Sequence, residues 1–203
     1  MSLFSKLLRP LELGDHIWYH THRGLIQHHR IYVGNGHVIH FDDNDTDRRY
    51  GHCKGCIESL NNRPGGYVRY SCLACWRLGD ATRNIYLCKY DKKLLSLIMR
   101  ETGSRSMERS HPGHVIAARA WWYFENDNFG RWELFSHNCE DFSRFCTILK
   151  LGSKQSIRGL LLIAALRGIV VRTVLGFAAL RVLRSWKQAK LLRDLPQNLS
   201  FTW

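Results

Sequence analysis

A short stretch in the first quarter of the chain constrains the fold more than any other feature. Two runs rich in β-branched and aromatic residues, IQHHRIYV and VIHF, flank the tripeptide GNG. Strong β-formers on either side of a glycine-containing turn predict a hairpin. Because side chains alternate along a strand, His28 and Arg30 are expected on one face of the first run. His29, Ile31 and Val33 are expected on the other face, which is the core-facing one.

The rest of the chain supplies further strands and several helices. Patterns of alternation and of helical spacing predict strands over residues 14–20, 26–33, 38–41 and 84–90, a short strand over 132–135, and helices over 94–101, over 114–125 and from Cys139 onward. Residues 48–80 are expected to be irregular. These elements predict an α+β fold in which an antiparallel sheet packs on helices.

Length and charge divide the chain unequally. The 203 residues suit one domain, expected over residues 11–150, followed by a basic apolar tail over 151–203. The formal charge is +13, and the tail holds nine of the basic residues but only one acid, Asp194. Such a surplus favours anionic partners. The N-terminus lacks the apolar core of a secretory signal, which indicates an intracellular protein.

The segment SHNCEDFSRFC places a cysteine where a helix is predicted to begin. Asn138 is a favourable N-cap residue, and Glu140 and Asp141 suit the first turn, where the helix dipole favours carboxylates. Cys139 is therefore expected at the first helical position, an environment that lowers a thiol pKa and favours the nucleophilic thiolate. The alternative is a buried and inert cysteine.

Four other cysteines have the spacing of a structural zinc site. Cys53, Cys56, Cys72 and Cys75 form the pattern C-x2-C-x15-C-x2-C within residues 48–80. Two such pairs can close a tetrahedral site with four thiolates. A closed site of this kind contributes stability, and no organic cofactor is expected. The alternatives are an accidental spacing with two reducible disulfides, or a zinc ribbon that binds nucleic acid.

A thiolate mechanism also requires a base within hydrogen-bonding reach. The predicted hairpin offers four histidines: His28, His29, His37 and His40. Their residue types and spacing alone do not decide which of them meets Cys139.

The motifs GDHIWYH, QHHRIYVGNGHVIHF and NCEDF, taken together, resemble the lecithin:retinol acyltransferase (LRAT) family over residues 11–149. This family is a rearranged branch of the NlpC/P60 papain-like thiol fold. The paired cysteines, SCLACWRLGD and IYLCKYD are most similar to the plant-type NC-domain members. The resemblance implies a triad in which Cys139 is the nucleophile, His28 is the base and His40 orients His28.

The same resemblance implies a thiol-dependent acyltransferase or phospholipase A-like enzyme. It would form an acyl thioester from a phospholipid ester and pass the acyl group to water or to an acceptor that the sequence does not identify. Two departures stand out, because Asp141 replaces a histidine of the animal members, and Arg30 replaces a small residue on the face of His28. The alternatives are a membrane-binding module of the same fold without turnover, and a thiol peptidase or amidase of the NlpC/P60 group.

The tail is expected to associate with a membrane. Residues 159–180 are long enough to span a bilayer, but the stretch contains Arg167 and Arg172. Two central arginines cost about 5 to 7 kcal/mol, and the Leu, Ile, Val and Phe residues return about 4 to 7 kcal/mol. A spanning helix, an interfacial helix and a helix packed on the domain therefore remain alternatives. An anionic phospholipid surface is the expected partner, reached from the cytoplasm, and nucleic acid is not.

Overall fold

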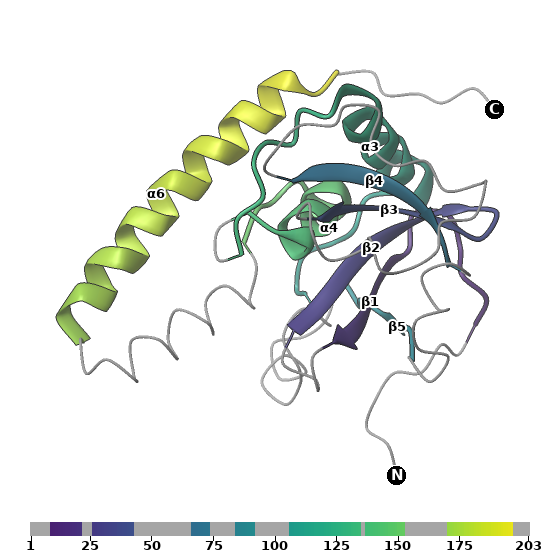
Figure 1. Ribbon diagram of the computed structural model, residues 1–203, viewed down its shortest axis with the longest axis horizontal. Coiled ribbons are helices and arrows are strands. Elements are labelled where there is room, and N and C mark those ends of the chain that lie inside the picture. Colours follow the sequence, from purple (N-terminus) through teal and green to yellow (C-terminus); the bar gives the residue numbers. More distant parts are fainter. Residues whose placement is uncertain are drawn as a thin grey trace, which may run out of the picture.

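The computed structural model describes residues 9–21, 26–42, 66–73, 84–91, 106–134, 137–152 and 170–196. Five antiparallel strands form one sheet in the order β4-β3-β2-β1-β5 (Figure 1). The strands are β1 (His16–Thr21), β2 (Ile26–Gly34), β3 (His37–Asp42), β4 (Tyr67–Cys72) and β5 (Tyr86–Leu87). The described helices are α3 (Gly113–Asn126), α4 (Cys139–Ile148) and α6 (Val170–Asp194). The predicted α+β class is confirmed.

The predicted hairpin is formed by β2 and β3. Ile31 pairs with Ile39, and Gly34 pairs with His37 across the turn. Asn35 and Gly36 form the turn with φ of 49° and 73°. Glycine, and asparagine among the other residues, most readily adopt this left-handed region, which explains why the tripeptide GNG ends one strand and begins the next.

The fourth strand corrects the expectation of irregular structure over residues 48–80. β4 pairs with β3 along its whole length, from His37 opposite Cys72 to Asp42 opposite Tyr67. Its sequence YVRYSC is rich in β-formers and alternates, with Val68 fully buried in the core between the sheet and the helices. Cysteines, glycines and a proline surround this short strand in the sequence, and their presence led to the prediction of irregular structure.

The sheet opens into two arms at one end. β2 pairs with β3 from Gly34 to Ile31. Beyond that point β2 continues to Ile26 beside β1, while β3 continues to Asp42 beside β4. Figure 1 shows the two arms diverging toward α4. We call the region between residues 26–30 of β2 and residues 40–42 of β3 the gap between β2 and β3. Because β3 does not pair with β2 there, backbone groups of β2 are available to residues of α4.

Buried residues lie on both faces of the sheet. The main core lies between the sheet and the helices and includes Ile31, Ile39, Phe41, Val68, Tyr123, Phe129, Phe142 and Phe145. The opposite face holds a smaller cluster of Ile17, Tyr19, Val38 and Ile85. The alternation predicted for β2 is confirmed, because Ile31 and Val33 belong to the main core and Tyr32 packs against the smaller cluster.

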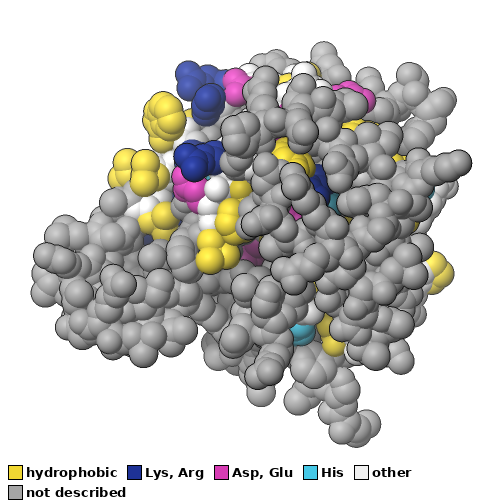
Figure 2. Space-filling view, in the orientation of Figure 1, with side chains coloured by type: hydrophobic (Ala, Val, Ile, Leu, Met, Phe, Trp, Pro, Cys, Tyr) yellow, Lys and Arg dark blue, Asp and Glu magenta, His cyan; other side chains and the backbone are white. Residues whose placement is uncertain are grey.

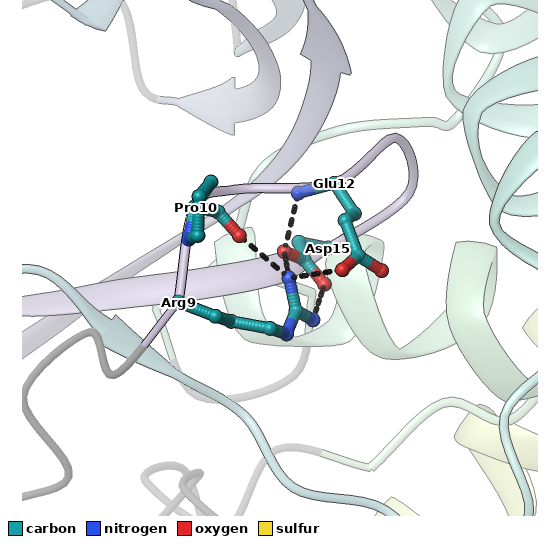
Figure 3. A network of polar contacts seen from close by, with 4 residues as sticks. All are labelled: Arg9, Pro10, Glu12 and Asp15. Carbon is teal, nitrogen blue, oxygen red and sulfur yellow. Dashed lines mark hydrogen bonds and ion pairs between the residues drawn. The ribbon is translucent and has the colours of Figure 1, made fainter.

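A polar network fixes the chain just before β1 (Figure 3). The Arg9 guanidinium donates to both carboxylate oxygens of Asp15, at 2.8 and 2.7 Å, and to the carbonyl oxygen of Pro10. The Asp15 carboxylate also accepts the backbone N–H of Glu12. This bidentate pair holds the turn that leads into β1.

The C-terminal half of α6 packs on the domain. Leu191 is 4% exposed and belongs to the main core, and its carbonyl oxygen accepts the hydroxyl of Tyr123 at 3.1 Å. Gln188 accepts the backbone N–H of Leu151, and Lys187 pairs with Glu133 at 3.2 Å. None of the helices among the described residues has both the length and the apolar character needed to cross a bilayer.

The predicted helices have different outcomes. The helices expected over residues 114–125 and from Cys139 are confirmed as α3 and α4. The helix expected over 94–101 lies outside the described residues. So does the first part of the predicted apolar stretch, residues 159–169. In the described part of the strand predicted over 132–135, there is only an isolated bridge between Glu133 and His137, and residue 135 lies outside the described residues.

Candidate functional site

The start of α4 has the N-cap predicted from the sequence. The Asn138 side-chain oxygen accepts the backbone N–H groups of Glu140, at 2.9 Å, and of Asp141, at 3.2 Å. The Asp141 carboxylate accepts the Asn138 N–H in return, which completes a capping box. Its other oxygen accepts the N–H of Gly152 at 2.7 Å. The acid at position 141 therefore holds the helix start and the chain that follows α4.

The Cys139 sulfur lies against the backbone of β2, at the level where β2 and β3 have separated. Its thiol donates to the carbonyl oxygen of Gln27 at 3.6 Å, and the sulfur accepts the backbone N–H of His29. These two groups belong to the part of β2 that runs beside β1, beyond the residues paired with β3. The sulfur thus forms hydrogen bonds with β2 backbone groups that do not pair with β3.

Burial overrides the expected activation of this thiol. Cys139 is 7% exposed, and desolvation raises its pKa to about 12. The His29 N–H and the Arg30 charge lower the pKa, but Asp42 and Glu140 raise it. The sequence-based expectation of a lowered thiol pKa is wrong for this state of the protein, because the helix start is covered. A base must therefore remove the proton during any reaction of the sulfur.

His28 and His40 lie on the sheet face opposite the helices. The His28 ring stacks on Tyr19 with centroids 5.4 Å apart. The His40 ring is buried, and its Nε2 lies 3.1 Å from the Ser71 hydroxyl oxygen. Desolvation holds the His40 pKa well below its ordinary value, and the charges of Arg30 and Arg69 lower it further. Both rings therefore share a face with two guanidinium groups.

Arg30 links this face to the thiol. It is 1% exposed, and its guanidinium lies 5.9 Å from the centroid of the Tyr19 ring. Its charge lowers the pKa of both Cys139 and His40, which places it near both groups. The catalytic roles of Cys139, His28 and His40 stay predictions.

Arg69 and Ser71 are neighbours of His40 that the sequence analysis missed. Arg69 pairs with His40 across β3 and β4, and its guanidinium donates to the Tyr67 hydroxyl at 2.8 Å. Arg69 and Ser71 both belong to β4, a segment that was predicted to be irregular. The alternation in YVRYSC is the signal that would have placed them beside His40.

A second histidine pair lies on the helix-facing side of the sheet. The His16 Nε2 and the His29 Nδ1 are 2.9 Å apart, and the other His16 nitrogen bonds to the Tyr90 hydroxyl. Desolvation lowers the His29 pKa to about 4 and holds the His16 pKa well below its ordinary value. Both rings are therefore neutral at pH 7. The sequence analysis had no signal that joined these distant residues.

The predicted zinc site falls mostly outside the described residues. Cys53, Cys56 and Cys75 lie outside them, and Cys72 ends β4, where it is half-buried. The four-cysteine site stays a prediction.

Comparison with known proteins identifies the family. Residues 9–153 match the family model described as lecithin retinol acyltransferase. The chain is also 28% identical over 166 residues to Protein LEAD-SENSITIVE 1 of Arabidopsis thaliana. That alignment spans 72% of this chain and 61% of the plant relative. The resemblance drawn from the hairpin and from the NCEDF segment is confirmed. The chain belongs to the lecithin retinol acyltransferase family.

Proposed function

We propose that the protein is a thiol-dependent acyl enzyme that takes an acyl group from a phospholipid ester. The observation that carries the proposal is the position of Cys139. Its sulfur lies at the N-terminus of α4 and at the base of the gap between β2 and β3. These two strands carry His28 and His40, and the Arg30 charge reaches both the thiol and His40. Family membership supports the same chemistry.

The proposed first step transfers the acyl group to sulfur. His28 takes the Cys139 thiol proton while the sulfur forms a bond to the ester carbonyl carbon. The backbone N–H at the start of α4 stabilises the negative charge on the carbonyl oxygen. The carbon–oxygen bond then breaks, and the departing lysophospholipid alkoxide takes the proton from His28. Water or an amine or alcohol acceptor then forms a bond to the thioester carbonyl carbon and gives its proton to His28. The carbon–sulfur bond breaks, the acylated acceptor or free acid leaves, and the Cys139 thiolate takes the proton back from His28.

The raised thiol pKa defines what His28 must do. A thiol with a pKa of about 12 is protonated at pH 7 in the absence of substrate. Nucleophilic attack therefore requires proton transfer to a neutral imidazole in the same step. The guanidiniums of Arg30 and Arg69 disfavour a third positive charge on an imidazole of the same face. A substrate phosphate beside them would offset that effect and would help His28 to accept the proton.

Intact-protein mass spectrometry tests the chemistry directly. The full chain is incubated with phosphatidylcholine and with phosphatidylserine vesicles, and the mass of an acyl adduct is sought. Cys139→Ser should remove the adduct. Cys146→Ser is the matched control, because Cys146 is a buried cysteine of the same helix in the main core. It should keep the adduct, with only a modest loss of stability.

A membrane-binding module without turnover is the second candidate. The observation that favours it is the burial of the Cys139 thiol beside a guanidinium at a position where the family usually has a small residue. If the wild type forms no adduct with either lipid, and Arg30→Gly does not create one, the acyl-enzyme proposal is wrong and the module remains. An adduct formed with a peptide or amide substrate alone would instead identify a thiol peptidase or amidase.

We also propose that α6 binds an anionic lipid surface. Val182, Leu183 and Trp186 are 70%, 54% and 66% exposed on this helix. Arg181, Lys190 and Arg193 are exposed on the same helix. Figure 2 shows hydrophobic and basic side chains together where α6 borders the domain. Apolar side chains bordered by cations suit the interface of an anionic bilayer.

Vesicle sedimentation tests the lipid proposal. Trp186→Glu should weaken binding to phosphatidylserine vesicles by at least tenfold, because it removes an apolar anchor and adds a repelled charge. Met107→Glu is the matched control, since Met107 is 54% exposed outside α6. Equal binding by Trp186→Glu and by the wild type would contradict the proposal. Equal binding of the wild type to zwitterionic and anionic vesicles would also contradict it.

The third proposal concerns the four-cysteine insertion. We propose that Cys53, Cys56, Cys72 and Cys75 hold one structural zinc ion, on the strength of their spacing. The strand position of Cys72 fits this role, because pairing with His37 of β3 fixes the backbone of this ligand. Chelation should lower the melting temperature of the protein. An unchanged melting temperature of metal-free protein would exclude a structural ion.

A further inference from the structure

Three potential metal ligands meet on the helix-facing side of the sheet. They are His16 from β1, His29 from β2 and Cys88, which directly follows β5. One ligand atom from each lies within 4.8 Å of the others. The register explains the meeting, because Trp18 lies opposite His29 on one side and opposite Tyr86 on the other. Alternation then turns all three side chains to the same face.

We propose that His16, His29 and Cys88 bind one thiophilic divalent cation of the zinc class. This site differs from both the candidate active site and the four-cysteine insertion, and it goes beyond the proposed acyl-enzyme function. Two imidazoles and one thiolate are ligands that zinc accepts readily. Three protein ligands leave a fourth tetrahedral position for water or for a further ligand.

The distances fit a zinc ion after a small adjustment. Zinc binds imidazole nitrogen at about 2.0 to 2.1 Å and thiolate sulfur at about 2.3 Å. In a tetrahedral site these bond lengths separate two nitrogens by about 3.4 Å, and a nitrogen from a sulfur by about 3.6 Å. The His16 Nε2 and the His29 Nδ1 are 2.9 Å apart, so they need to open by only about 0.5 Å. The Cys88 sulfur lies within 4.8 Å of a ligand nitrogen of each ring, so it would need to approach by at most about 1.2 Å.

A fixed hydrogen-bond partner supports the ligand role of His16, and burial supports that of both rings. Metal-bound imidazoles usually bond through their other nitrogen to a fixed group, which sets the ring orientation. The His16 Nδ1 bonds to the Tyr90 hydroxyl, and Tyr90 also bonds to the Thr147 side chain of α4. His16 and His29 are 3% and 0% exposed, and burial favours the neutral ring that binds a metal.

An ion at this site would act on the candidate nucleophile through His29. The His29 backbone N–H holds the Cys139 sulfur, and its ring would be a metal ligand. Fixing that ring would fix the strand segment against which the thiol lies. The buried Glu140 beside Cys139 adds a negative charge near His29, and at that ring its effect is larger than the opposing effect of the Arg144 charge.

Zinc content of the full chain provides the first test. Wild-type protein purified with zinc and dialysed without chelator should retain one equivalent that depends on Cys88. Cys88→Ser should lose about one equivalent, and Cys146→Ser should retain it. The four-cysteine set is distinguished by Cys53→Ser, which should lose a separate equivalent while the one that needs Cys88 remains. Folded Cys88→Ser with the zinc content of the wild type would overturn the proposal.

Two further measurements keep the test decisive if Cys88→Ser fails to fold. Cadmium-113 NMR of the loaded wild type should show a resonance typical of one thiolate and two imidazoles, apart from any four-thiolate resonance. Tyr90→Phe keeps the aromatic ring but removes the contact to His16, so it should weaken zinc binding about 10- to 100-fold. A cadmium spectrum without the mixed-ligand resonance would overturn the proposal, and so would unchanged zinc affinity of folded Tyr90→Phe.

Discussion

The two faces of the sheet carry two histidine pairs in different electrostatic surroundings. On the helix-facing side, His16 and His29 lie beside a thiol, a phenol, the carboxylate of Glu140 and the guanidinium of Arg144. On the other side, His28 and His40 lie with the guanidiniums of Arg30 and Arg69. His28 and His29 are adjacent in the chain, and alternation alone sends them to opposite faces.

The difference shows how one strand can support two kinds of chemistry. On the helix-facing side, the Cys88 thiol and the Glu140 carboxylate can offset the charge of a cation held between the imidazoles, although the Arg144 guanidinium opposes it. On the other face, burial and then the charges of Arg30 and Arg69 lower the His40 pKa, and the two guanidiniums suit an anionic substrate. The Cys139 sulfur lies at the gap between β2 and β3, where the two environments meet, because it bonds to the β2 backbone at Gln27 and His29.

The largest expected effect separates the two pairs by function. His28→Gln should lower the rate of acyl-adduct formation about 10²- to 10⁴-fold, the usual contribution of a general base. It should leave the zinc content unchanged, because His28 faces away from His16 and His29. The measurements are the time course of the adduct mass and elemental analysis. His37→Gln is the control, since His37 stacks on Tyr70 outside both pairs.

Adduct formation by His28→Gln at the wild-type rate would assign the base to another residue. Loss of zinc from folded His28→Gln would show that the two faces are not independent.

A pH series tests whether the histidines on both faces are neutral. The His29 pKa is lowered to about 4, and the His16 and His40 pKa values are also lowered. Stability from a lowered histidine pKa is present above the unfolded pKa of 6.5 and is lost as the pH falls toward 4. For His29 alone the loss is on the order of 3 kcal/mol.

Asp141 opposes this trend, because its pKa is raised to about 6 and its protonation stabilises the fold as the pH falls below that value. The stability lost through the lowered pKa values of His16, His29 and His40 outweighs the stability gained through the raised pKa of Asp141. The free energy of unfolding in urea, measured with chelator present, should therefore fall from pH 7 to pH 4.5. Constant or rising stability over this range would contradict the neutral buried rings.

The smallest effect compares the two cores. Ile39→Val in the main core and Ile17→Val in the smaller cluster remove the same methyl group from side chains that are both 0% exposed. Each should lower the free energy of unfolding by about 0.5 to 1.5 kcal/mol. Val182→Ala, at a site 70% exposed, should change it by less than about 0.5 kcal/mol. A negligible effect of Ile17→Val would show that the second face is less well packed than the first.

Local patterns in the sequence are sufficient to predict the elements around the candidate site. The turn residues Asn35 and Gly36 and the β-formers beside them predict the hairpin, because their preferences act within a few residues. The Asn138 cap predicts the start of α4 for the same reason. Alternation along β2 also separates His28 from His29, since the two-residue period of a strand needs no distant partner.

Tertiary structure decided what depends on distant partners. β4 is stable because β3 lies beside it, although a reading of composition suggests an irregular loop. The thiol pKa of Cys139 is set by burial against β2, which outweighs the local effect of the helix start. His16, His29 and Cys88 meet only because β5, β1 and β2 are neighbours in one sheet. Strand order and desolvation depend on the packing of the whole chain, so local sequence preferences do not determine them.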